Sequence, residues 1–176
     1  MARKFTLQFP PTAWIPVPGV DGSGNPYGPA FVANTSSDTP AIPRVALAFD
    51  DGNDEAAVSV PFMWPAEYVS TDVTGTVFFH TTSVTDTVAW TLQVEKSETG
   101  PIDLKDGAAG FDTSVNDFAA TAAAAGGGVT EVTLTISNLD SIAAGDLVYL
   151  KLFRDTLRDV ATDDANMVLF TLHEGS

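Results

Sequence analysis

The sequence predicts an all-β protein: an eight-stranded, jelly-roll-like β-sandwich that follows an extended, proline-rich N-terminal arm. Apolar side chains recur at every second position through residues 44–176, which is the period of a half-buried strand. Glycine, aspartate and asparagine separate these runs, as turns between short strands require. The chain has 176 residues and a mass of 18.5 kDa, enough for one domain with a sizeable core.

Residues 1–43 form the arm. Most of the prolines lie there, and proline fixes φ and removes a backbone donor, so we expect an extended segment outside the sandwich domain of residues 44–176. The apolar side chains of the arm are Phe5, Leu7, Phe9, Trp14 and Ile15. They either fold back on their own domain or dock on a partner, with residues 5–9 adding a strand to an exposed sheet edge. Both interpretations stay open. As the hypothesis to be tested, we assign the five residues to partner docking.

The strands follow from period-two patterning. The clearest run is residues 129–137, in which Val132, Leu134 and Ile136 share one face. The same pattern, rich in threonine and valine, predicts strands at 44–49, 55–63, 75–81, 87–96, 148–152 and 168–172. Pro61 lies inside one of these runs and cannot donate to a ladder, so we place that strand at a sheet edge or at a bulge.

Residues 111–125 are ambiguous. Phe111, Val115 and Phe118 have helical spacing, and three glycines at 126–128 would end a helix. The alternative is a loop that leads into a strand near residues 117–123. We favour the loop and strand, because they complete the eight strands of a jelly roll.

The charge balance excludes several partners. Lys and Arg number 8 against 23 Asp and Glu, which gives a formal net charge of −15 and a pI of about 4.1. Such a surface repels nucleic acid and anionic membranes, so we predict neither as a partner. The sequence has no cysteine, and no apolar run of signal or membrane-spanning length occurs in it. These features fit a protein that folds in a cytoplasm.

Two acidic segments raise the question of calcium. Residues 50–55 carry oxygen ligands but lack the spacing of a twelve-residue calcium loop, and we favour an acidic hairpin turn at Asp51-Gly52. A second acidic segment lies beside Arg154 and Arg158; its carboxylates are Asp155, Asp159, Asp163 and Asp164. Local pairing of acids with arginines explains that segment better than a metal. We therefore predict no metal site and no cofactor.

Catalytic motifs are missing from the sequence. His80 and His173 are isolated, and no zinc-binding, nucleophile-elbow or phosphate-loop motif occurs. Glu67 and Asp72 could be posed as a glycosidase pair, but in so acidic a chain any such pair is expected by chance. We predict no catalytic residues and no enzymatic activity.

Two aromatic side chains indicate an interaction surface on one strand. Tyr149 and Phe153 fall on the strand face opposite Val148, Leu150 and Leu152. A sugar-stacking platform and an oligomer interface both use such residues, and for Tyr149 and Phe153 we favour self-association. Trp64 and Trp90 are expected in the core.

Four segments carry a resemblance to a known group of proteins: residues 60–68 (VPFMWPAEY), 88–94 (VAWTLQV), 144–155 (AGDLVYLKLFRD) and 166–173 (NMVLFTLH). Through them, residues 45–174 resemble virion structural proteins of tailed phages, whose sandwich domains decorate or cement the capsid. The resemblance implies a trimeric jelly roll on the outer surface of the capsid lattice, with arms that reach between neighbours and with no catalysis.

The predicted function is therefore capsid decoration. The protein would bind the major capsid protein and itself as a homotrimer, and would be a virion component made in the host cytoplasm. Many weak, symmetric contacts would stabilise the shell, and the exchanged arms would act at high effective concentration. The alternative is a tail- or fibre-associated β-sandwich module that binds a receptor or a carbohydrate.

Overall fold

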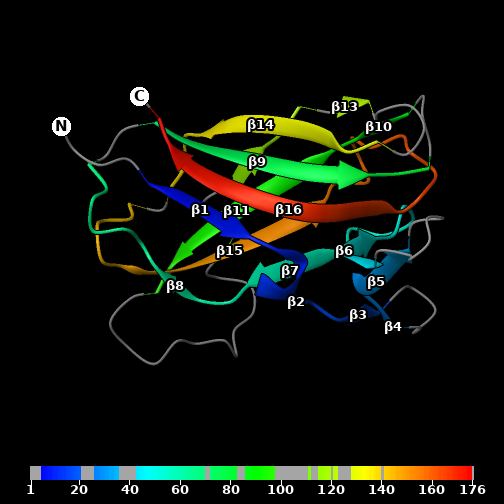
Figure 1. Cartoon of the computed structure of the whole chain (residues 1–176), viewed down its shortest axis with the longest axis horizontal. Helices are drawn as coiled ribbons and strands as arrows, with labels where there is room; N and C mark the ends of the chain where they lie inside the picture. The colour runs from blue at the N-terminus through cyan, green and yellow to red at the C-terminus, as the bar shows by residue number, and fades with distance from the viewer. Residues whose placement is uncertain are drawn as a thin grey trace.

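The computed structural model describes residues 5–20, 26–35, 43–69, 72–82, 86–97, 111, 115–119, 121–122, 128–139 and 141–175. Within these ranges the one helical element is the short 3-10 helix η1 (Pro11–Ala13), and the other elements are β-strands. The strands build two six-stranded antiparallel sheets, here sheet A and sheet B, that lie face to face (Figure 1). The fold is thus the all-β, jelly-roll-like sandwich that the sequence predicts. No helix of the described ranges is long and apolar enough to cross a membrane.

Sheet A has the order β14-β9-β16-β6-β5, with β1 also paired to β16. Its strands are β1 (Thr6–Phe9), β5 (Ala30–Thr35), β6 (Pro43–Phe49), β9 (Val73–His80), β14 (Thr130–Ile136) and β16 (Ala165–Glu174). Two short strands share one side of the long β16: β6 pairs with its beginning and β1 with its end. Figure 1 shows β1 running beside β16 in this way.

Sheet B has the order β12-β11-β15-β7-β2, with β8 also paired to β15. Its strands are β2 (Trp14–Pro16), β7 (Ala56–Ser59), β8 (Phe62–Met63), β11 (Trp90–Lys96), β12 (Val115–Asp117) and β15 (Leu147–Arg154). Two minor ladders complete the described strands, β3 (Gly19–Val20) with β4 (Pro26–Tyr27) and β10 (Thr87–Val88) with β13 (Thr121–Ala122).

The core lies between the sheets and is rich in aromatic rings. Trp90 of sheet B meets two rings of sheet A edge-on, with centroid distances of 5.0 Å to Phe49 and 5.8 Å to Phe79. Trp64 is also buried, as predicted, against Phe5 at 5.6 Å. Burying each such side chain contributes about 1.5–3 kcal/mol, and edge-to-face geometry adds to it. These contacts hold the two sheets in a fixed relation.

The N-terminal segment belongs to the sandwich, which corrects the predicted arm. Phe5, Phe9 and Trp14 lie in the core with exposed fractions of 8%, 5% and 2%, and Leu7 packs against it. These side chains therefore serve their own chain in this structure. The physical reason is that strands β1 and β2 find partners within the same chain, where the effective concentration is high, and their rings lose water contact there. Ile15, 56% exposed, is the exception.

Of two predictions for the connections, one is confirmed and one is wrong. Between β7 and β8 the pairing with β15 shifts by one residue, so Pro61 lies at a bulge, one of its two predicted places. The sheet-edge alternative does not hold for β7, since β2 covers its outer side. The segment at Asp51-Gly52 is not a hairpin turn, because it connects β6 of sheet A to β7 of sheet B.

The ambiguous stretch of residues 111–125 carries strands where it is described. β12 pairs with β11, and β13 pairs with β10. The described residues of this stretch contain no helix. Phe118 follows β12 and is fully buried in the core. Its burial anchors the chain at the point where it leaves β12 toward β13.

Candidate functional site

The outer face of sheet B carries a straight row of side chains across five strands. The ladder partners place them in the order Val115, Gln93, Lys151, Val58 and Ile15, here the central row. At a strand spacing of roughly 4.8 Å, the row is about 19 Å wide. The outermost two side chains are exposed and apolar, and the two polar ones lie next to each other within the row.

Tyr149 and Phe153 flank the central row on the same face. Burial alternates strictly along β15, with Val148, Leu150 and Leu152 fully buried on the inner side. The period-two pattern therefore predicts the orientation of both aromatic residues correctly. Phe153 lies opposite Thr91 in the ladder, and Tyr149 lies opposite Glu95. Their role in self-association stays a prediction.

Gln93 supplies an unused acceptor within this face. Its side chain is 8% exposed, and its amide oxygen Oε1 is buried without a hydrogen-bond partner. Leaving a buried polar atom unpaired costs about 1–3 kcal/mol. Because Oε1 is closed off from solvent, a ligand hydroxyl reaches it and recovers that cost only when the side-chain amide turns outward. The sequence analysis missed Gln93, because a single glutamine between Leu92 and Val94 looks like any outward strand position.

Lys151 brings a cation to the same place. Its ammonium nitrogen lies 5.8 Å from the ring centroid of Phe111 and 5.8 Å from that of Phe153. A cation at this distance is attracted by the faces of aromatic rings. Lys151 was also not selected from the sequence, although the alternation along β15 places it on the same face as Tyr149 and Phe153.

The β12 edge of the face is held rigidly by Arg158. Its Nη2 donates to Thr91 Oγ1 at 2.7 Å and to Asp117 Oδ1 at 3.1 Å. Its Nε pairs with Asp155 Oδ2 at 2.5 Å. Thr91 in turn donates to Asp117 at 2.8 Å. These bonds tie the short strand β12 to the loop after β15, and they keep the rim of the face in place.

Arg154 is buried, and it links the two sheets. Its Nε and Nη2 pair with the Asp159 carboxylate at 2.6 and 3.2 Å. Nη1 donates to the carbonyls of Phe49 and Asp163, and Nη2 to that of Ala161. The predicted pairing of this acidic loop with its arginines is thereby confirmed for Asp155 and Asp159. That the arginine is fully buried was not foreseen.

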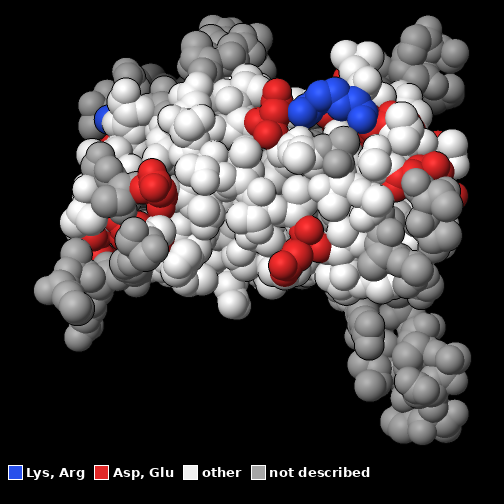
Figure 2. Space-filling view, turned by 90° about the horizontal axis from the view of Figure 1, so that it is seen from above, with Lys and Arg blue, Asp and Glu red and all other residues white. Residues whose placement is uncertain are grey.

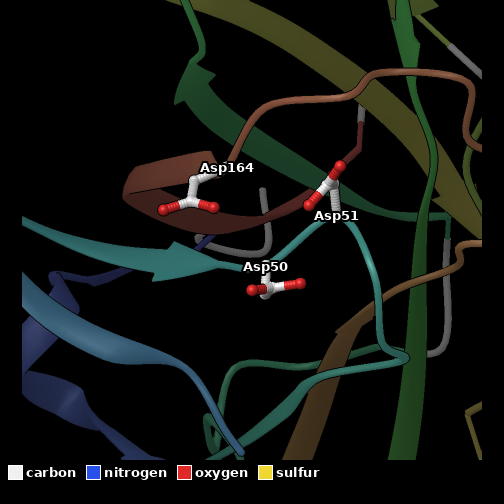
Figure 3. A group of neighbouring side chains, drawn as sticks. All are labelled: Asp50, Asp51 and Asp164. Atoms are coloured by element: carbon white, nitrogen blue, oxygen red, sulfur yellow. The ribbon is translucent and has the colours of Figure 1, made fainter.

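Three exposed carboxylates meet at one end of the sandwich. Asp50 and Asp51 follow β6, Asp164 precedes β16, and one carboxylate oxygen from each lies within 4.8 Å of the others (Figure 3). Partial burial raises the pKa of Asp164, and the charges of Asp50 and Asp51 raise it further. The two acidic segments lie far apart in the sequence, and only the fold brings a member of each together. Three exposed oxygens fall short of the six to eight that calcium takes.

Glu55 lies beneath this cluster and is satisfied within the chain. Its oxygens accept hydrogen bonds from the backbone N–H groups of Gly28 at 2.9 Å and Asp50 at 2.8 Å. The pKa of Glu55 is raised above its usual value, because the effect of burial exceeds that of the two backbone hydrogen bonds, which lower it. Glu55 therefore shapes the turn after β6.

The two histidines do not converge. His80 pairs with Asn166 at one end of sheet A, whereas His173 pairs with Thr74 at the other. Positions 74 and 80 lie on the same strand, about 20 Å apart at 3.3 Å per residue. His173 Nδ1 is hydrogen-bonded to Thr6 Oγ1 at 2.8 Å. The structure therefore does not form a metal site from this pair.

Basic side chains are scarce on the surface and lie beside acidic ones. In the space-filling view the larger basic group has acidic side chains next to it on either side (Figure 2). Lys96 pairs with Asp146 at 3.2 Å. Within the described ranges, Lys151 takes part in no ion pair, which sets it apart from Lys96, Arg154 and Arg158.

Comparisons with known proteins concern the fold. No protein-family model matches the chain, and no curated relative does either. The chain is similar in structure to an arabinose-bound α-L-arabinofuranosidase, with a TM-score of 0.51 and 9% identity over 91% of this chain and 23% of that one. At this identity the likeness shows the β-sandwich fold and nothing finer.

Two further solved structures align over nearly the whole chain at lower scores. One is the C-terminal carbohydrate-binding module (family 6) of a marine laminarinase from Zobellia galactanivorans, with a TM-score of 0.45 and 10% identity over 97% of this chain and 100% of that one. The other is a Clostridium thermocellum xylanase 10B, with a family 22 carbohydrate-binding module, in complex with xylohexaose. It has a TM-score of 0.47 and 14% identity over 99% of this chain and 28% of that one. The predicted capsid role gains no support from these comparisons and stays a prediction.

Proposed function

We propose that the protein is a carbohydrate-binding β-sandwich module and that it binds sugar on the outer face of sheet B. This is the function that the sequence analysis held as its alternative. The structurally similar proteins are carbohydrate-binding modules and carbohydrate-active enzymes, which agrees with it. Since those similarities show the fold alone, the proposal rests on the chemistry of the face.

The observation that carries the proposal is the unpaired amide oxygen of Gln93 beside aromatic rings. Sugars present hydroxyl groups around their edge and C–H groups on their ring faces. Once its amide turns toward solvent, Gln93 Oε1 can accept a hydrogen bond from a hydroxyl, and Lys151 Nζ can donate one. Tyr149 and Phe153 offer ring surface on either side of the central row, where sugar C–H groups can pack.

The apolar end of the row fits a chain-shaped ligand. Val58 and then Ile15 follow Lys151 in the row, and Ile15 is 56% exposed on the outer side of sheet B. A polysaccharide chain that crosses the strands would contact Gln93 and Lys151 first and these apolar groups beyond them. The proposal concerns binding and includes no reaction.

The test is a screen of the intact chain against soluble polysaccharides by affinity electrophoresis, with calorimetry for each positive. The double variant Tyr149→Ala/Phe153→Ala should weaken binding at least tenfold, which corresponds to about 1.4 kcal/mol. The matched control is Thr76→Ala/Thr133→Ala on the outer face of sheet A, where the two hydroxyls bond each other at 2.7 Å. The control should leave binding unchanged.

Two results would contradict the proposal: no polysaccharide bound by the unaltered chain, or full binding by the Tyr149/Phe153 variant. Sedimentation of the same samples tests the rival role of the face. If the chain forms an oligomer that this variant dissociates, and no sugar binds, the predicted self-association surface replaces the sugar site. Thermal unfolding of each variant verifies that it is folded.

A further inference from the structure

Lys151 is unusual among the cations of this chain. Lys96 pairs with Asp146, Arg154 with Asp159, and Arg158 with Asp155 and Asp117. The sequence has 23 acidic residues and 8 basic ones, so acidic partners are abundant. Among the described residues, Lys151 nevertheless has no carboxylate within ion-pair distance.

The surroundings of Lys151 explain why its charge is poorly compensated. Its ladder neighbours are Gln93 on one side and Val58 on the other, and neither carries a charge. Its ammonium group lies between the rings of Phe111 and Phe153, each 5.8 Å away. Rings and an apolar neighbour replace part of the water that an exposed lysine would keep, and they supply no counter-ion.

Other charged groups of the face lie in the adjacent rows. Glu95 is opposite Tyr149, one row from Lys151. Asp117 is opposite Thr91, in the row of Phe153, and it already pairs with Arg158. The central row therefore combines one cation and one unpaired acceptor on neighbouring strands. The acceptor, Gln93 Oε1, is buried and meets a ligand when its amide turns outward.

We propose that the sugar ligand is acidic and that its carboxylate or sulfate group pairs with Lys151 while a hydroxyl donates to Gln93. This inference rests on the proposed function and specifies its substrate class. Hydrogen bonds between an ammonium group and an anionic oxygen are about twice as strong as neutral ones. An acidic sugar satisfies both unpaired groups at once, whereas a neutral one leaves the charge of Lys151 without a counter-ion.

The experiment compares matched ligands by calorimetry on the intact chain. Oligogalacturonide is paired with its methyl ester, which has the same backbone without the charge, and dextran sulfate is paired with dextran. The two pairs distinguish a uronate carboxylate from a sulfate ester. The acidic member of at least one pair should bind about tenfold more tightly than its neutral counterpart.

Substitutions at Lys151 test whether this residue causes the preference for acidic ligands. Lys151→Met should abolish the preference, and Lys151→Arg should keep most of it, because the positive charge remains. Lys96→Met is the matched control: it changes the net charge equally, but it removes a cation that pairs with Asp146. The control should retain the preference. If Lys151→Met unfolds at a lower temperature than the binding assay, Lys151→Gln takes its place.

The outcomes separate the two proposals. Equal binding of acidic and neutral ligands, unaffected by Lys151→Met but lost in Tyr149→Ala/Phe153→Ala, overturns the acidic ligand and leaves the carbohydrate site standing. A preference for acid that Lys96→Met removes as strongly as Lys151→Met also overturns it. Failure of the unaltered chain to bind any of the four ligands, or any other polysaccharide, overturns both proposals.

Discussion

The two outer faces of the sandwich differ in whether a buried polar atom is left without a hydrogen bond. On sheet A, Thr76 bonds Thr133 across the ladder at 2.7 Å, and Thr6 bonds His173 at 2.8 Å. On sheet B, the Gln93 amide oxygen is left unpaired. A face whose polar groups already bond each other gains little from a ligand, whereas one with an unpaired acceptor recovers a real cost. The capacity to bind therefore depends on which groups are unsatisfied and not on how many are polar.

The largest expected effect comes from removing Arg154, whose buried side chain connects the two sheets and so keeps both outer faces in place. Arg154→Ala removes the buried guanidinium that joins Phe49 O of sheet A to the loop after β15. It leaves the Asp159 carboxylate without its main partner, with a side chain that is 2% exposed. We expect a loss of about 3–5 kcal/mol in the free energy of unfolding, measured by urea denaturation.

Arg158→Ala is the matched comparison for that variant, because the Arg158 side chain is 35% exposed and solvent screens its pairs. Its expected cost is about 1 kcal/mol. Equal effects of the two substitutions would show that burial does not set the importance of these arginines.

The second prediction compares the faces directly through stability. Gln93→Leu removes an unpaired buried acceptor and adds apolar volume of similar size, so we expect stabilisation by about 1 kcal/mol. Thr133→Val on sheet A instead removes the partner of Thr76, so we expect a loss of roughly 0.5 kcal/mol. Urea denaturation of both variants measures the difference.

The same pair of variants sharpens the functional side of the comparison. Gln93→Leu should weaken sugar binding while it stabilises the fold, and Thr133→Val should leave binding unchanged. Destabilisation by Gln93→Leu would mean that its amide oxygen has a partner in solution, and the contrast between the faces would then fail.

The smallest expected effect lies outside both faces, at Asp164. Partial burial and the neighbouring charges of Asp50 and Asp51 raise its pKa in the folded state. The stabilisation from holding the proton is fully present below the unfolded pKa and is lost as pH rises through the folded pKa. At pH 7 the charged group opposes folding. Asp164→Asn should therefore stabilise the protein there by a few tenths of a kcal/mol, because solvent screens the cluster.

Two controls accompany the Asp164 measurement. The gain from Asp164→Asn should vanish at acid pH and shrink in 1 M salt, where the Debye length is about 3 Å. Glu131→Gln, an exposed carboxylate on β14, should show no comparable gain. A gain that persists at low pH would contradict an electrostatic origin.

Within residues 44–176, the sequence by itself determined most of the strands and the faces of their side chains. Alternation at Val148, Leu150 and Leu152 implied that Tyr149 and Phe153 point outward, and β15 has that arrangement. This works because the direction of a strand side chain depends on its own backbone, whose period of two is visible in the residues. The core positions of Trp64 and Trp90 followed from the same reasoning.

Only the tertiary structure decided which strands are neighbours. It placed Gln93 beside Lys151, brought Asp164 to Asp50 and Asp51, and buried Phe5, Phe9 and Trp14 in their own chain. The local pattern shows that a side chain needs burial, but the partner that buries it is chosen by the total apolar surface and hydrogen bonding of the whole fold. The candidate site was hidden for the same reason, since its unpaired groups arise from contacts between segments far apart in sequence.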